Sequence, residues 1–143
     1  MTPDTLAQVM EATWPPHRRW NLGPFTLRDG AAGGKRVSAA SCEGAFTAAD
    51  LDAAEAAMTE PLMLIRAGDD TLDAALDARG WRIVDPVIAY AAPVDQLTAE
   101  LPFLSDFPHW PPLAITRTLW EEGGIGPARV AVMERVLGPK TAI

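Results

Sequence analysis

The sequence predicts an α/β (α+β) fold in which helices flank a mixed sheet, with additional helices toward the C-terminal end. Three observations support this class. Helical periodicity marks residues 3–13, the apolar run at residues 62–66 is typical of a strand covered on both faces, and short strand-like segments alternate with helical ones up to residue 92. The expected order of elements over residues 1–92 is α-β-β-α-β-α-β.

The first helix has clear boundaries in the sequence. Thr2 suits the N-cap, and Pro3 suits the first helical position, where a missing N–H costs nothing. The Trp-Pro-Pro sequence at residues 14–16 ends the helix, because proline cannot continue it. Residues 17–23 are predicted to form a connection.

Two short strands are predicted next, at residues 24–28 and 35–41. The glycine-rich residues 29–34 form a turn between them that is too long for a two-residue hairpin. The small side chains of the second segment predict close packing beneath a helix.

A second helix and a central strand are expected to follow. Thr47 and Asp50 have the spacing of a capping box, with aspartate in place of the usual glutamate, so the helix begins near Thr47. Glu60 and Pro61 end it, and the apolar run at residues 62–66 then forms the central strand.

A third helix is predicted at residues 72–79. Gly80 is a strong C-terminal stop, and Trp81 can fold back on Leu76 in a Schellman-type contact. A long strand is expected at residues 81–91, where Pro86 indicates an edge position or a bulge.

The remaining residues form two further parts. Residues 93–112 contain five prolines and are predicted to be a linker. Residues 113–143 are predicted to contain two helices, separated by glycines, that begin a second unit. Thr141 to Ile143 look like the first residues of a strand. The expected organisation is therefore an α/β domain at 1–92, a linker at 93–112 and helices at 113–143.

Composition and charge exclude several classes of protein. The formal net charge of −7 argues against a nucleic-acid partner, which requires a basic surface. The single cysteine excludes an internal disulfide framework and a cysteine-based zinc site. No stretch approaches the roughly 20 apolar residues of a membrane span, so no membrane partner is expected. The first 16 residues lack the basic and apolar regions of a secretory signal, so a cytoplasmic location is expected.

Residues 46–91 resemble the second half of the fold of the GNAT superfamily, the acyl-CoA-dependent N-acetyltransferases. In that fold a helix leads to a central strand, and a second helix ends at a glycine followed by an aromatic residue and a long strand. Residues 72–81, Leu-Asp-Ala-Ala-Leu-Asp-Ala-Arg-Gly-Trp, match this junction. Together with the sequence Gly-Lys-Arg-Val-Ser at residues 34–38, they resemble the degenerate N-terminal domain of bacterial tandem GNAT proteins. Residues 123–129 and the helix after them are similar to the opening of the second, catalytic domain.

The resemblance implies acetyl-CoA as the cofactor of the family, but this chain departs from the family at the cofactor loop. GNAT enzymes bind the pyrophosphate with a Gln/Arg-x-x-Gly-x-Gly/Ala loop before a helix. Residues 40–46 stand at that place here, and they have one glycine and an acid, Glu43. The chain alone is therefore expected not to bind acetyl-CoA, and no catalytic residue is assigned to it. Metal ligands are not assigned either, because His17 and His109 each lack a second ligand at metal spacing.

Lys35, Arg36 and Arg66 are the candidate substrate-binding residues. On neighbouring strands they could meet over one face and bind an anionic ligand. They could equally pair with the acids of the helix between Asp50 and Glu60.

Two functions are therefore expected from the sequence. In the first, the chain is the non-catalytic N-terminal part of a GNAT-type acetyltransferase, which moves an acetyl group from acetyl-CoA to an amine, and its partner is a C-terminal catalytic GNAT domain. In the alternative, the chain is a non-catalytic module for dimerisation, as a homodimer, or for substrate recognition. A third possibility is an unrelated α/β fold that shares only the order of elements, and a fully antiparallel sheet would favour it.

Overall fold

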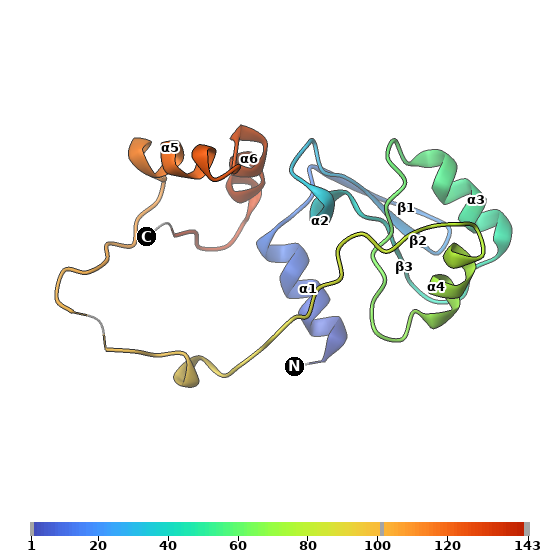
Figure 1. The fold of residues 1–143 in the computed structure, drawn as a ribbon, viewed down its shortest axis with the longest axis horizontal. Coiled ribbons are helices and arrows are strands. Elements are labelled where there is room, and N and C mark those ends of the chain that lie inside the picture. Colours follow the sequence, from blue (N-terminus) through green and yellow to red (C-terminus); the bar gives the residue numbers. More distant parts are fainter. Residues whose placement is uncertain (1, 101, 142–143) are drawn as a thin grey trace.

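The computed structural model describes residues 2–100 and 102–141 and places them in an α+β fold. This confirms the coarse fold class, while the GNAT-like details stay a prediction. The elements in chain order are α1 (Pro3–Thr13), β1 (Arg18–Leu22), β2 (Phe25–Asp29), α2 (Lys35–Ser38), β3 (Ser41–Cys42), α3 (Ala48–Ala57), α4 (Asp70–Asp77), η1 (Val94–Gln96), α5 (Ala114–Glu122) and α6 (Pro127–Arg135). Figure 1 shows α3 and α4 beside one end of the sheet, while α5 and α6 lie beyond α1 and α2 at the other end.

The first helix is confirmed, with the predicted caps. The Thr2 hydroxyl accepts a hydrogen bond from the Thr5 N–H at 3.2 Å, and Pro3 occupies the first turn. Trp14 ends the helix, as predicted from the prolines that follow it.

The described strands form one sheet in the antiparallel order β1-β2-β3, so they do not form the mixed sheet predicted from the sequence. The prediction that residues 17–23 form a connection is wrong, because Arg18–Leu22 is a strand that pairs along its length with β2. Gly23 adopts a left-handed φ of 56°, which allows a two-residue turn before β2. The alternation of polar residues with Trp20 and Leu22 was the available signal for this strand.

The prediction of a strand at residues 35–41 is also wrong in most of its length. Lys35–Ser38 forms one short helix, α2, and β-pairing begins only at Ala40, with one bridge there and the strand β3 at Ser41–Cys42. Val37 is fully buried on the inner side of α2, and the Ser38 hydroxyl donates to the Gly34 carbonyl at 3.0 Å. Val37 is the single large apolar side chain of this segment, and one helical turn is enough to bury it.

The helix from Thr47 is confirmed as α3, together with its capping box. The Thr47 N–H donates to Asp50 Oδ2 at 2.8 Å, and the Asp50 N–H donates to the Thr47 hydroxyl at 3.2 Å. Leu51 and Ala54 are buried on its inner face, in a core cluster that β2, β3 and α4 complete. The Phe25 and Phe46 rings meet edge to face in the same core, with centroids 5.7 Å apart.

Residues 62–66, predicted as a central strand, make one parallel bridge instead. Met63 lies opposite Ala40, where the Ala40 N–H donates to the Leu62 carbonyl at 2.9 Å and the Leu64 N–H donates to the Ala40 carbonyl at 2.8 Å. The chain then turns at Arg66, whose N–H donates to Asp69 Oδ2 at 2.8 Å. The bridge between Ala40 and Met63 therefore joins, in parallel orientation, the chain segments that precede and follow α3.

The third predicted helix is confirmed as α4, and its end has the expected Schellman form. The Trp81 N–H donates to the Leu76 carbonyl at 3.1 Å, the Gly80 N–H donates to the Asp77 carbonyl at 2.9 Å, and Gly80 has a φ of 82°. Trp81 packs against the core that contains Leu76.

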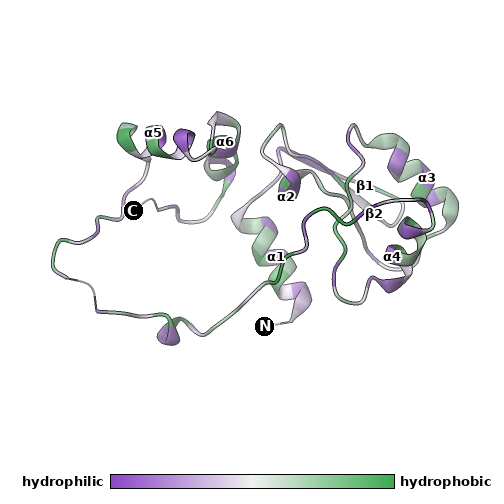
Figure 2. Ribbon diagram, viewed as in Figure 1, coloured by the Kyte–Doolittle hydropathy of each residue, from purple (hydrophilic) through white to green (hydrophobic). Residues whose placement is uncertain are grey.

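The long strand predicted at residues 81–91 has no strand partner among the residues that the structure describes. The segment is irregular, and Ile83, Val87, Ile88 and Tyr90 are exposed. Figure 2 shows the chain after α4 as irregular chain that carries hydrophobic residues, and it continues into the proline-rich residues, where the one-turn helix η1 forms. A strand-like composition is not sufficient here because no sheet edge is placed beside it.

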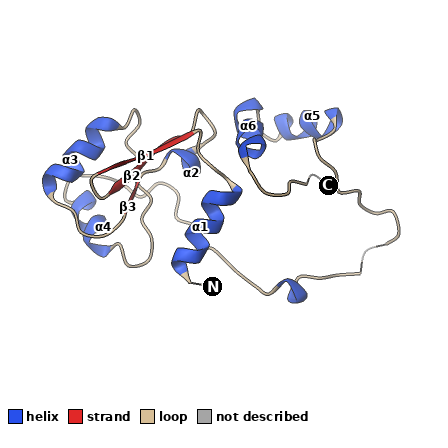
Figure 3. Ribbon diagram, turned by 180° about the vertical axis from the view of Figure 1, so that it is seen from behind, coloured by secondary structure: helices blue, strands red, loops and turns tan. Residues whose placement is uncertain are grey.

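The two C-terminal helices are confirmed as α5 and α6 (Figure 3). In α6 the buried residues are Val130 and Val132, whereas Met133 is partly exposed. Arg135 Nη2 donates to the Pro15 carbonyl at 3.3 Å, which connects α6 to the end of α1. The strand predicted to begin at Thr141 falls largely on residues 142–143, outside the described residues.

A nearly buried arginine connects α1 to the sheet. The Arg28 side chain is 7% exposed, and its guanidinium donates to Glu11 Oε2 at 2.8 Å, to the Ala39 carbonyl at 2.9 Å and to the Ser41 hydroxyl at 3.0 Å. Arg19 holds the other Glu11 oxygen at 2.9 Å. Burial by itself raises the pKa of Glu11, but the hydrogen bonds and charges of Arg28 and Arg19 outweigh it, so the pKa lies below its ordinary value of 4.5.

Replacing Glu11 by glutamine should lower the free energy of unfolding at pH 7 by about 2 kcal/mol, because Arg28 loses its charged partner. Since the folded-state pKa is lowered, the stability from Glu11 is present above pH 4.5 and lost as the pH falls through the folded value. Urea unfolding of Glu11→Gln and the wild type at pH 7 and pH 3 measures both effects.

Glu121→Gln is the matched control, since Glu121 is exposed at the end of α5. An equal loss of stability in the two variants, or a loss that does not shrink at low pH, would contradict the role assigned to Glu11.

Candidate functional site

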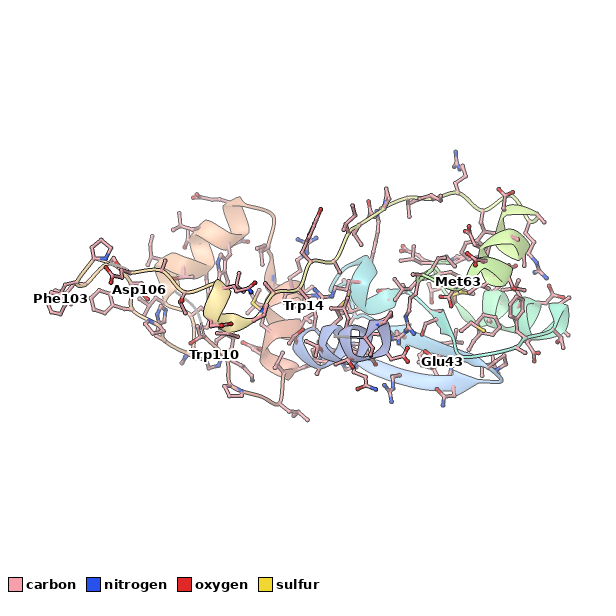
Figure 4. The ribbon with its side chains drawn as sticks, turned by 90° about the horizontal axis from the view of Figure 1, so that it is seen from below. Trp14, Glu43, Met63, Phe103, Asp106 and Trp110 are labelled. Atoms are coloured by element: carbon pink, nitrogen blue, oxygen red, sulfur yellow. The ribbon has the colours of Figure 1, made fainter. Side chains whose placement is uncertain are left out.

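A basic cleft lies between α2, α6 and the end of α1. Its volume is about 420 Å³. Three basic side chains and one acidic one contribute to its wall, in a chain whose net charge is −7. The residues that line it are Trp14, Gly33, Gly34, Lys35, Arg36, Asp85, Ile125 and Arg129. Figure 4 shows Trp14 at this junction, with the C-terminal helices on one side and the sheet on the other.

The glycine-rich turn before α2 shapes one wall of the cleft. Ala31 and Ala32 have φ angles of 47° and 62°, and the Gly33 N–H donates to the Gly30 carbonyl at 2.9 Å. A Cβ on Gly33 would lie 2.9 Å from that carbonyl oxygen and even closer to Val132 Cγ2. The absence of a side chain at Gly33 therefore lets α6 pack directly on the turn.

Lys35 extends from the first turn of α2 and pairs with Asp85. Lys35 Nζ lies 2.7 Å from Asp85 Oδ2, and each of the two side chains is 61% exposed. Such an exposed pair contributes little to stability, because water and salt screen it. Asp85 belongs to the irregular segment after α4, so the ion pair joins this segment to the helix α2.

The Arg36 side chain contacts the C-terminal end of α1. Its Nη2 donates to the Met10 carbonyl at 3.0 Å, the same carbonyl that accepts from the Trp14 N–H at 3.2 Å. A cation at a helix C-terminus is favourable because the last carbonyls carry partial negative charge. Burial lowers the pKa of Arg36, but an arginine keeps its charge at neutral pH.

Arg129 is the third cation and lies over the glycine-rich turn. Its Nε and Nη2 are each 3.9 Å from the position of a Cβ built on Gly34. Among residues 2–100 and 102–141, no ion pair or side-chain hydrogen bond of Arg129 is found. Its guanidinium is exposed and available to a ligand.

Of the three residues predicted from the sequence, the cleft contains Lys35 and Arg36 but not Arg66. Arg66 pairs with Glu43 at 3.1 Å near the start of α3. The alternative, pairing of these cations with the acids of the second helix, is not what the structure shows for them. Arg79 makes that contact instead, with Asp52 at 2.7 Å and Glu55 at 3.2 Å.

A second, aromatic cavity of about 270 Å³ adjoins the cleft through Trp14, which lines both. Lys140 Nζ lies 5.5 Å from the centre of the Trp110 ring and donates to the Glu134 carbonyl at 2.7 Å. The lining residues are Thr13, Trp14, Trp110, Trp120, Met133, Val136, Lys140 and Thr141. This cavity carries one cation and no acid in its lining.

Sequence reasoning missed Arg129, Asp85 and Trp14 as members of the cleft. They come from three segments that are distant along the chain, and their types and spacing do not indicate proximity. The run of basic residues up to Arg36 was the available signal, and it located one wall of the site.

Other polar groups support structural roles. Cys42 is buried, and burial, followed by the charges of Asp69, Glu43 and Asp50, raises the pKa of its thiol, which disfavours the reactive thiolate. In the described part of the chain, no cluster of three or more histidine, cysteine, aspartate or glutamate side chains is arranged to hold a metal ion. The described helices also include none with the length and apolar character needed to cross a membrane.

Comparison of the chain with known protein families, with curated proteins and with solved structures finds no match.

Gly33→Ala should lower the free energy of unfolding by about 2 kcal/mol, because the added methyl group overpacks the contact with Val132. Chemical denaturation measures the loss, and Gly138→Ala is the control, since nothing lies within 4 Å of that position. Adding Val132→Ala to Gly33→Ala should cost less than the sum of the two single losses. Additive losses would show that α6 does not pack on the turn.

Proposed function

We propose that this chain is a non-catalytic part of a GNAT-type N-acetyltransferase, the class of enzyme that moves an acetyl group from acetyl-CoA to an amine. The observation that carries the proposal is the parallel contact between Ala40 and Met63 across α3. The strand-helix-strand order expected in this part of the fold implies a parallel contact across the helix, and one parallel bridge is present there. The helix end at Gly80 and Trp81 adds support, since its glycine and aromatic residue stand where the resemblance places them.

The loop before α3 does not fit the pyrophosphate of acetyl-CoA. Asp50 Oδ2 accepts from the Thr47 N–H at 2.8 Å and from the Thr47 hydroxyl at 2.7 Å, so a carboxylate of the chain already occupies the start of α3. These hydrogen bonds lower the pKa of Asp50 and keep it charged at neutral pH. Glu43 adds a second carboxylate to the same loop. Arg66 offsets the charge of Glu43, but the Asp50 carboxylate still opposes a polyphosphate at the start of α3, and this supports a role without acetyl transfer for this chain alone.

The proposal assigns residues 81–91 to a strand that forms when a C-terminal catalytic GNAT domain is present. Their apolar, β-branched composition supports this assignment. A cytoplasmic location belongs to the same proposal. Cys42 is a free, buried thiol, which is compatible with a reducing compartment.

Calorimetric titration of the chain with acetyl-CoA should give no saturable binding, because the α3 loop presents Glu43 and Asp50 to the phosphates. The same titration of Arg129→Met tests the contribution of the exposed arginine of the basic cleft. Saturable micromolar binding that persists in Arg129→Met would overturn the non-catalytic assignment. Slow amide exchange at Ala40 and Leu64, relative to Val84, tests the parallel contact itself, and fast exchange at both amides would remove the observation that supports the fold.

A dimerisation module is the second candidate function, and exposed apolar residues favour it. Ile83, Val87, Ile88 and Tyr90 are each at least 75% exposed along one unpaired segment. An unpaired segment of this composition can add to the same segment of a second copy, which satisfies its backbone groups.

Sedimentation velocity should then show a dimer for the wild type that Ile88→Asp abolishes, since a buried charge at the contact is unfavourable. Ile115→Asp on α5 is the control, because Ile115 is also exposed, at 62%, but lies outside this segment. A monomer for the wild type at high concentration would rule out the dimer.

A further inference from the structure

The basic cleft already holds a carboxylate, that of Asp85. Its Oδ2 lies 2.7 Å from Lys35 Nζ, and both side chains are largely open to water. Asp85 is carried by an irregular segment and not by a helix or strand. The carboxylate of Asp85 is therefore held only weakly beside Lys35, and a carboxylate from solution can replace it.

Arg129 supplies a second cation that faces the same cleft. Its guanidinium lies over Gly34, which has no side chain to block access and has a φ of 108°. The planar fork of an arginine binds a carboxylate through two parallel hydrogen bonds. The Lys35 ammonium and the Arg129 guanidinium can both contact one carboxylate. Arg36 adds positive charge from its position at the end of α1.

Apolar side chains lie in the same wall. Trp14 and Ile125 are partly buried members of the lining. Trp14 offers a wide aromatic surface, and it borders the aromatic cavity on its other side. A ligand that fits this arrangement has a carboxylate joined to an apolar body, since each part then meets a group of its own kind.

We propose that the cleft binds the carboxylate of an apolar organic acid, which takes the place of Asp85 beside Lys35 and pairs with Arg129. The local excess of positive charge attracts an anion although the chain as a whole is acidic. The volume of about 420 Å³ lies within the range of small-molecule sites. The proposal uses none of the residues of the α3 loop and does not depend on the acetyltransferase resemblance.

Calorimetric titration with 2-naphthoate tests the site, with 2-naphthalenemethanol as the neutral analogue. Naphthoate should bind and the alcohol should bind at least tenfold more weakly. Arg129→Met should weaken naphthoate binding about tenfold, because it removes a charged pair of hydrogen bonds. Asp85→Asn should strengthen binding about threefold, because it removes a competing carboxylate of modest strength. Arg82→Met is the matched control, since Arg82 is an exposed arginine near Asp85 that does not line the cleft, and it should leave the affinity unchanged.

Three results would overturn the proposal. The first is equal binding of naphthoate and the alcohol, which would indicate an apolar site alone. The second is equal weakening in Arg129→Met and Arg82→Met, which would indicate a general effect of charge. The third is a lack of binding to both the wild type and Asp85→Asn. Circular dichroism and unfolding curves of each variant establish that it is folded, and the exposed positions of Arg129 and Asp85 make folded variants the expected outcome.

Discussion

The contact of Arg28 with Glu11 holds the N-terminal half of this protein together. Arg28 sits in β2, and its guanidinium reaches α1 through Glu11 and the segment before β3 through Ala39 and Ser41. A charge that is 7% exposed must have partners, so the positions of three elements are set by one side chain. Once α1 is fixed in this way, its C-terminal end presents the Met10 carbonyl to Arg36 and the Trp14 side chain to the cleft. The ion pair of Arg28 and Glu11 therefore positions α1, and with it one wall of the candidate site.

The local signals in the sequence predicted the helices well. Thr2, the Thr47–Asp50 capping box and Gly80 each act through groups within a few residues, so their effect can be inferred from spacing alone. The strands were predicted less well, because pairing depends on which segments meet. Arg18–Leu22 is a strand because β2 lies beside it, and residues 81–91 are not one because no described edge lies beside them.

The candidate site shows the same division. Lys35 and Arg36 were predicted to bind an anion from a strand, and both line the cleft, although they lie on α2. Arg66 was grouped with them on the assumption that residues 35–41 and 62–66 form neighbouring strands. The segments do touch at Ala40 and Met63, but Arg66 lies beyond that bridge, where the chain turns toward Glu43. Arg129 and Asp85 could not have been predicted, because packing of Val132 on Gly33 and the path of an irregular connection bring them to the cleft.

The tethered position of Asp85 links the cleft to the connection that carries it. Lys35 holds that connection to α2 through the ion pair with Asp85. A molecule that displaces Asp85 also releases residues 81–93 from this hold, and by reciprocity anything that draws the segment into a sheet leaves the cleft open. Salt would act in the same direction as a ligand, because it screens the exposed pair. Under the two proposals, ligand binding in the cleft and strand pairing of residues 81–91 therefore depend on the same ion pair.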